Sequence, residues 1–252
     1  MSYFRDQAKL YAEYRPDYPA ALFSFIASLA PRRQLAPQRQ LAWDCATGNG
    51  QAAVGLVEHF DRVIATDLSA EQISHARPHP RIEYRVAAAE ESGLDNASVD
   101  VVNVSQALHW LNFDRFYREV RRVLVPGGAL VVTGYVDPVL DDPELNAMLH
   151  AYNKVTVGPC WPPERKIIDD LYRNVPFPFD ELPTPQLTLE RDWSLAELAG
   201  YLRSWSATVR YTTQHGRDPV AEFESAMRPK WGDPQQRRRV RWPFVIRAGR
   251  VK

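Results

Sequence analysis

Short apolar segments alternate with segments of helical pattern between residues 41 and 132, and this alternation restricts the possible folds more than any other feature. Strands separated by helices form βαβ units, in which the strands are parallel and the helices cover both faces of the sheet. The sequence therefore predicts an α/β protein with a doubly wound sheet. The expected strands are 41–45, 62–66, 82–87, 99–104 and 129–132, and the expected helices are 51–60, 69–76 and 113–124.

The segments outside this regular part have a different character. Residues 20–30 predict a helix, and the polar, proline-bearing segment 31–40 predicts a linker. Residues 137–185 are rich in proline and aromatic residues, which predicts a long irregular lid or binding segment. A last strand is expected at 239–248, where Pro243 places it at or near an edge. We expect one domain, with N-terminal helices and a cofactor cover in 1–40, a cofactor-binding core in 41–136, substrate-binding lid insertions and helices in 137–235, and a final edge or antiparallel strand in 236–252.

The loop after the first expected strand carries the sequence DCATGNGQAAVG, at Asp44–Gly55. Gly48, Gly50 and Ala53 satisfy the dinucleotide pattern G-x-G-x-x-G/A, and Asp67 follows at the end of the second strand. Glycines let the backbone approach a ligand closely, and a carboxylate at this strand end accepts hydrogen bonds from ribose hydroxyls. These features suit either NAD or another adenosine cofactor.

Asp44 separates the two cofactor classes. It lies inside the first strand, where its carboxylate would repel a dianionic pyrophosphate and attract a cofactor that ends in a positively charged amino acid. This favours S-adenosyl-L-methionine over NAD. The alternative is that Asp44 only accepts backbone hydrogen bonds at the turn.

Further motifs extend the pattern along the chain. DCATGNG, ATDLS, AAAEESGL, QALHW and LVPGG together resemble class I S-adenosylmethionine-dependent methyltransferases of the group called type 11. The likeness is strongest over Asp44–Val132. YAEYRPDYP and YLRSWSATVRY are similar to segments of trans-aconitate methyltransferase-like enzymes, which act on small molecules, often carboxylates. The resemblance implies a Rossmann-like, seven-stranded, mostly parallel sheet and S-adenosyl-L-methionine as cofactor.

The resemblance also implies roles for residues around the cofactor. Asp44, Gly48 and Gly50 would surround its methionine part with backbone contacts from Ala46 and Thr47. Asp67 would bind the ribose and Leu68 would lie against the adenine. The remaining expected cofactor contacts are Ala89 and Glu90 at the adenine amino group, Ser105, Gln106 and Ala107 after the fourth strand, and Tyr11 and Arg15 as a cover, with Arg15 pairing with the carboxylate. The alternative for Glu90 is a solvated loop residue without a cofactor contact. The alternative for Tyr11 and Arg15 is that they belong to an ordinary surface helix.

His109 is the candidate catalytic residue, because it follows the fourth strand, where the transferable methyl group is expected. It would take a proton from a hydroxyl or steer a carboxylate, which needs no base. With Trp110 it would equally form an aromatic wall. Trp161 and Arg203 are the other expected acceptor contacts, with core packing and surface charge as their alternatives.

Composition narrows the function classes that fit the chain. The chain has 31 basic and 31 acidic residues, which argues against broad nucleic-acid binding. The two cysteines and six histidines show no metal-site spacing, and no apolar run is long enough to predict a membrane span. We expect a cytoplasmic monomer or homodimer that methylates a small molecule, without metal, membrane or nucleic acid. A nicotinamide-dependent oxidoreductase and a non-catalytic cofactor-binding protein are the alternatives.

Overall fold

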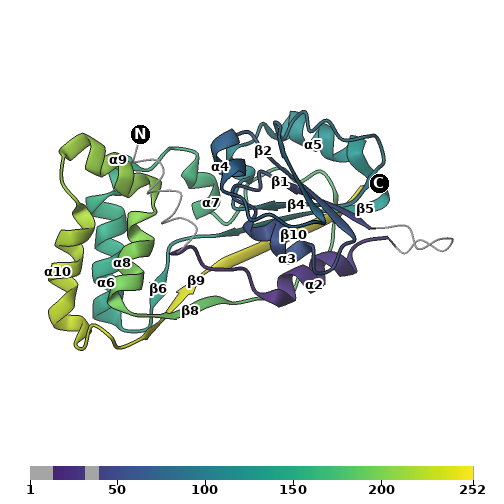
Figure 1. Ribbon diagram of the computed structural model, residues 1–252. Coiled ribbons are helices and arrows are strands. Elements are labelled where there is room, and N and C mark those ends of the chain that lie inside the picture. The colour runs from purple at the N-terminus through teal and green to yellow at the C-terminus, as the bar shows by residue number, and fades with distance from the viewer. Residues whose placement is uncertain (1–13, 32–39, 252) are drawn as a thin grey trace. The chain divides into compact units, whose positions relative to one another are not determined.

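The apolar runs of residues 41–132 become the centre of a seven-stranded sheet in the computed structural model, which describes residues 14–31 and 40–251 (Figure 1). The strand order is β3-β2-β1-β4-β5-β10-β7. Strands β1 to β5 are parallel, whereas β10 runs antiparallel to both of its neighbours. The predicted α/β, doubly wound, mostly parallel sheet is confirmed. The strands are β1 (Leu41–Cys45), β2 (Arg62–Asp67), β3 (Ile82–Val86), β4 (Val99–Ser105), β5 (Leu124–Tyr135), β7 (Asp180–Glu181) and β10 (Phe244–Arg250).

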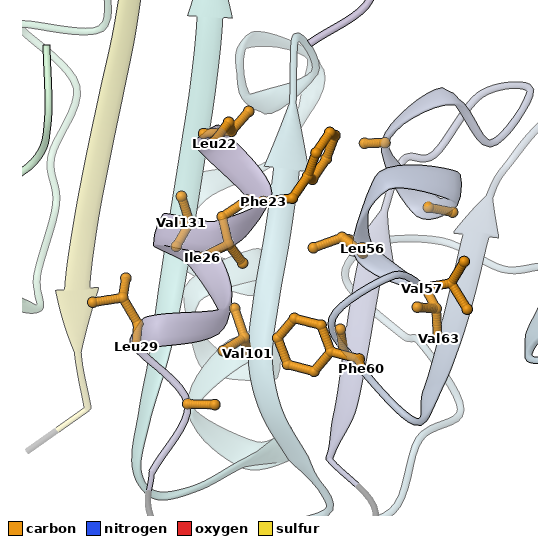
Figure 2. Packing of buried hydrophobic residues seen from close by; sticks show 14 of the residues in the cluster. Leu22, Phe23, Ile26, Leu29, Leu56, Val57, Phe60, Val63, Val101 and Val131 are labelled. Atoms are coloured by element: carbon orange, nitrogen blue, oxygen red, sulfur yellow. The ribbon is translucent and has the colours of Figure 1, made fainter. Parts of the chain in front are cut away.

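Helices cover both faces of this sheet. On one face, Leu22 and Ile26 are fully buried against strand residues such as Val131 (Figure 2). On the opposite face, the ring of Trp43 in β1 lies 6.5 Å from the ring of Phe116. The apolar residues of β1 therefore serve two packing layers, as the near-continuous apolar runs predict. The helices concerned are α2 (Ala20–Ser28), α3 (Gln51–Leu56), α4 (Ala70–Ser74), the 3₁₀ turn η1 (Leu108–Trp110) and α5 (Phe113–Val123).

The chain divides into two compact units. The first, here called the sheet unit, comprises Asp17–Tyr135, Asp170–Leu187 and Phe244–Lys252. The second, here called the helical unit, comprises Met1–Pro16, Val136–Asp169 and Thr188–Pro243. From the sequence we expected one domain, with substrate-binding lid insertions and helices in 137–235.

The helical unit contains a three-stranded antiparallel sheet of order β6-β9-β8 and a set of helices. Its strands are β6 (Val139–Leu140), β8 (Leu189–Trp193) and β9 (Arg238–Trp242). Its helices are α6 (Pro143–Ala151), the π-helical turn η2 (Tyr152–Thr156), the 3₁₀ turn η3 (Gly158–Cys160), α7 (Arg165–Asp169), α8 (Leu195–Arg203), α9 (Ser206–His215) and α10 (Pro219–Trp231).

Two sequence predictions are wrong. Residues 137–185 are not irregular throughout, since they contain α6. At the N-terminus of α6 the Asp142 carboxylate accepts backbone N–H groups, and Pro143 stands in the first turn. The Asp-Pro pair is thus a helix start and not a breaker. The expected strand at 239–248 is two strands divided at Pro243, because β9 and β10 belong to different sheets. Strand β10 is antiparallel and second from the edge of its sheet, because only Gly249 and Arg250 pair with the short outer strand β7.

Candidate functional site

The loop between β1 and α3 makes a tight turn at the carboxyl end of the parallel strands. Ala46, Gly48 and Gly50 all have left-handed backbone conformations, with φ of 53°, 59° and 84°. The ring of Tyr84 approaches Gly50 so closely that a Cβ there would lie 2.8 Å from a ring carbon. The left-handed conformation therefore favours glycine at this position, and a side chain here would also have to displace the Tyr84 ring.

A buried carboxylate lies beneath this loop. Asp44 is 1% exposed, and its Oδ1 accepts the amide of Asn103 at 2.7 Å while its Oδ2 accepts the hydroxyl of Thr47 at 2.5 Å. Burial raises the pKa of Asp44 to about 6, although these hydrogen bonds act in the opposite direction. Ser105 extends the network, because its Oγ accepts hydrogen bonds from Asn103 at 3.0 Å and Thr133 at 2.9 Å. Asn103 and Thr133 were not singled out from the sequence.

Asp67 lies at the end of β2, as predicted. One carboxylate oxygen accepts the backbone N–H of Gly48 and the other accepts that of Ser69, both at 2.8 Å. Since an ionised carboxylate has about four acceptor positions, it can accept further donors. Two large apolar side chains are exposed at this strand end: Leu68 is 75% exposed, and Val86, which is in register with Asp67, is 56% exposed. Val86 was missed because strand register is not visible in the sequence.

The next predicted contacts follow β3. The Oε1 atom of Glu90 accepts the backbone N–H of Asn112, the N-cap residue of α5, at 2.9 Å. Glu90 is therefore tied to a helix start and is not a purely solvated loop residue. Ala89 beside it is buried. Their contacts with an adenine amino group stay predictions.

Gln106 has a structural role after β4. Its backbone is left-handed, with φ of 58°, and its amide group makes two 2.8 Å hydrogen bonds to the backbone of Tyr135. Because the amide is engaged on both sides, a cofactor contact from Gln106 would come from its backbone. Ala107, which follows it, is buried.

His109 is buried beside Tyr172. Its Nδ1 atom lies 2.9 Å from the Tyr172 hydroxyl, and the two rings are stacked with centroids 6.1 Å apart. The ring of Trp110 lies 4.8 Å from that of His109, and this tryptophan is more than half exposed. Nothing in the sequence indicated Tyr172, because it comes from a segment read as irregular.

The acceptor candidates and Arg15 belong to the helical unit. The indole N–H of Trp161 donates to Oδ1 of Asn153 at 2.7 Å, and Arg165 lies over the Trp161 ring at 3.7 Å. Arg203 forms ion pairs with Asp218 at 3.2 Å and Glu224 at 3.6 Å. The guanidinium carbon of Arg15 lies 5.5 Å from the centre of the Tyr201 ring. Tyr11 lies outside the described residues.

The described part of the chain contains no group of three or more His, Cys, Asp or Glu residues arranged to hold a metal ion. Within residues 14–31 and 40–251, no helix is both long enough and apolar enough to cross a membrane.

Comparison with known proteins places this chain in a family. Residues 43–132 match the family model described as a methyltransferase domain. A Dictyostelium discoideum protein named "Putative methyltransferase" is 32% identical over 226 residues, covering 89% of this chain and 84% of that protein. The chain belongs to the class I S-adenosylmethionine-dependent methyltransferase family. This membership favours the methyltransferase hypothesis over the nicotinamide-dependent oxidoreductase hypothesis.

Further relatives agree with this membership. A solved structure from Anaeromyxobacter dehalogenans, described as "a Putative Type II Methyltransferase", is 43% identical with a TM-score of 0.84 and covers 94% of this chain and 98% of that one. An "Uncharacterized methyltransferase" of Mycobacterium tuberculosis is 37% identical over 121 residues, 48% of this methyltransferase and 46% of its relative.

Proposed function

We propose that this methyltransferase binds S-adenosyl-L-methionine at the β1–α3 loop and transfers its methyl group to an oxygen atom, carboxylate or hydroxyl, of a small molecule. The observation that carries the proposal is the buried Asp44 carboxylate under the left-handed Gly48–Gly50 turn. A fixed negative charge at this position favours a cationic amino-acid group and disfavours a pyrophosphate.

The residues present fit this cofactor. Asp44 and the loop backbone would hold the amino-acid part, and the acceptor positions left on Asp67 would take the ribose hydroxyls. Leu68 follows Asp67, and Val86 is in register with Asp67. Both offer exposed apolar surface, which suits the adenine ring. The trans-aconitate methyltransferase-like subgroup and the small-carboxylate acceptor are supported by the YAEYRPDYP and YLRSWSATVRY segments alone.

The chemistry asks the protein mainly for positioning. Bound S-adenosylmethionine supplies a methyl group already activated on a sulfonium. The protein has to hold the acceptor oxygen in line with that group and exclude water. His109 would contact the acceptor oxygen, and Trp110 would form a wall beside it.

Parallel calorimetric titrations test the proposal. S-adenosylmethionine and S-adenosylhomocysteine are expected to bind, and NAD is not. Protein that binds the adenosyl compounds is then incubated with a panel of small carboxylic acids and alcohols, and S-adenosylhomocysteine formation is measured. Binding of NAD alone would refute the cofactor assignment. Binding without turnover on any acceptor of the panel would favour the non-catalytic alternative.

A further inference from the structure

Tyr172 enters the His109 environment through a strained segment of backbone. Leu171 and Tyr172 are consecutive non-glycine residues with left-handed φ values of 52° and 56°. Such conformations are unfavourable for residues with a Cβ and persist only where the surrounding structure enforces them. Here they direct a fully buried phenol at the Nδ1 atom of His109.

Arg247 of β10 holds this segment in place. Its guanidinium donates from one nitrogen to the carbonyl oxygens of Tyr172 and Val175, both at 2.9 Å, and from another to Glu181 at 2.5 Å. The Arg247 side chain is itself largely buried. Because Arg247 pairs with Val132 of β5, the anchor of the Tyr172 turn is part of the sheet.

The donors and acceptors around the Tyr172 hydroxyl determine which atom donates in its hydrogen bond to His109. A buried phenol needs an acceptor for its O–H proton. Nδ1 of His109 is the side-chain acceptor that the described structure provides. Burial raises the pKa of Tyr172, so the phenol keeps its proton, and backbone groups of His109 and Leu108 interact with its oxygen. Nδ1 therefore accepts, and the neutral imidazole carries its proton on Nε2.

We infer that Tyr172 is a positioning residue that holds His109 as the Nε2–H tautomer, so that His109 donates a hydrogen bond to the acceptor oxygen instead of acting as a general base. The inference rests on the proposed function for the presence of an acceptor. A donor at this position suits an oxygen that is already ionised, such as a carboxylate. The new carbon–oxygen bond then uses a lone pair of that oxygen, the carbon–sulfur bond leaves its electron pair on sulfur, and no proton has to be removed.

The tautomer can be measured without any ligand. In ¹⁵N spectra of the wild-type protein at about pH 8, where histidine is mostly neutral, His109 is expected to show a protonated Nε2 and an unprotonated Nδ1. The His109→Gln variant assigns its resonances by their loss. A proton found on Nδ1 in the wild type overturns the inference. Since this readout needs neither cofactor nor acceptor, failure of the proposed function would be seen separately, in the calorimetry.

Two phenylalanine variants isolate the hydroxyl. Tyr172→Phe is expected to change the His109 nitrogen shifts and to lower kcat about three- to tenfold, as for one lost neutral hydrogen bond, with unchanged affinity for S-adenosylhomocysteine. Tyr117→Phe is the matched control. The Tyr117 hydroxyl of α5 donates at 2.7 Å to the carbonyl of Pro176, which lies in the same segment as Tyr172. Unchanged His109 shifts in Tyr172→Phe, or equal changes in both variants, would overturn the assignment.

Substitution of His109 distinguishes a donor from a base. Glutamine keeps an N–H group near the Nε2 position, whereas alanine does not. If His109 donates, His109→Gln stays within about tenfold of the wild-type kcat and His109→Ala falls further. If His109 were the base, both variants would lose on the order of a hundredfold or more alike, and the inferred role would be wrong.

Discussion

At the scale of single residues, the ionised carboxylate of Asp44 lowers the free energy of unfolding of the protein. Asp44 is a buried carboxylate whose partners, Asn103 and Thr47, are neutral. Its pKa is about 6 in the folded protein and 3.8 as an ordinary value. The folded state thus binds the proton more tightly than the unfolded state. The contribution of Asp44 to the free energy of unfolding therefore falls as the pH rises from about 4 to about 6, and it stays low above that.

Asp44→Asn is accordingly expected to stabilise the unliganded protein at about pH 8, by up to about 3 kcal/mol. The asparagine can accept from Asn103 and donate to Thr47, so the network survives. The same change should lower the affinity for S-adenosylmethionine strongly, because the attracting charge is gone. Urea unfolding at about pH 8 and pH 4, with calorimetry, measures both effects. A variant less stable than the wild type at the higher pH would contradict the prediction.

Asp67 should behave differently, because its role is proposed to be direct ligand contact. Asp67→Ala is expected to reduce the affinity for S-adenosylhomocysteine by about tenfold to a hundredfold, the value of hydrogen bonds to a charged group. The lost bonds to Gly48 and Ser69 are only partly buried, so the protein should remain folded. Glu71→Ala, which removes an exposed carboxylate from the first turn of α4, is the control. If the melting temperature collapses while affinity holds, the assignment fails.

At the scale of elements, α5 is tied to the loop that follows β3. Glu119 of α5 accepts both the backbone N–H and the hydroxyl of Ser92, and it pairs with Arg122 at 2.7 Å. Burial alone would raise its pKa, but the hydrogen bonds from Arg122 and Ser92 lower it to about 2. The stabilisation is therefore complete above the ordinary pKa of about 4.5 and is lost as the pH falls towards 2.

Glu119→Gln should destabilise the protein by about 1–3 kcal/mol near pH 7, because one charge-assisted network is lost. The difference from the wild type should shrink as the pH falls below about 4. Because the same loop carries Ala89 and Glu90, a modest loss of S-adenosylhomocysteine affinity is also expected. Denaturant titrations near pH 7 and pH 3 test this. A penalty independent of pH would mean that packing, and not the carboxylate, supplies the stability.

Some helices and strands could be predicted from the sequence, and others could not. Strands β1 to β4 were located within one residue or so, because buried parallel strands are continuous apolar runs. Helix α6 was missed because residues 137–185 are rich in proline and aromatic residues, although Asp142 and Pro143 suit a helix start. The contact between His109 and Tyr172 depends on a left-handed turn and on Arg247 of β10. Such a long-range arrangement leaves no periodicity for sequence reasoning to detect.

At the scale of the whole molecule, each compact unit is assembled from separate stretches of the chain, which passes between the units after residues 16, 135, 169, 187 and 243. The family model matches residues 43–132, yet the sheet that contains them includes β10 from the other end of the described chain. All of β10 pairs with Ala129–Tyr135, and Ile246 and Ala248 belong to the apolar cluster of the sheet unit.

Removal of residues 244–252 should therefore abolish cooperative unfolding, although every proposed cofactor contact is retained. The loss combines a row of strand hydrogen bonds, worth about 1 kcal/mol each, with burial of Ile246, worth about 2–3 kcal/mol. It also removes the Arg247 anchor of the Tyr172 turn. The total is comparable with the 5–15 kcal/mol that stabilises a typical domain. Removal of Val251 and Lys252 alone, which lie beyond β10, is the control. A variant without residues 244–252 that melts cooperatively and binds S-adenosylhomocysteine like the wild type would mean that β1 to β5 are sufficient.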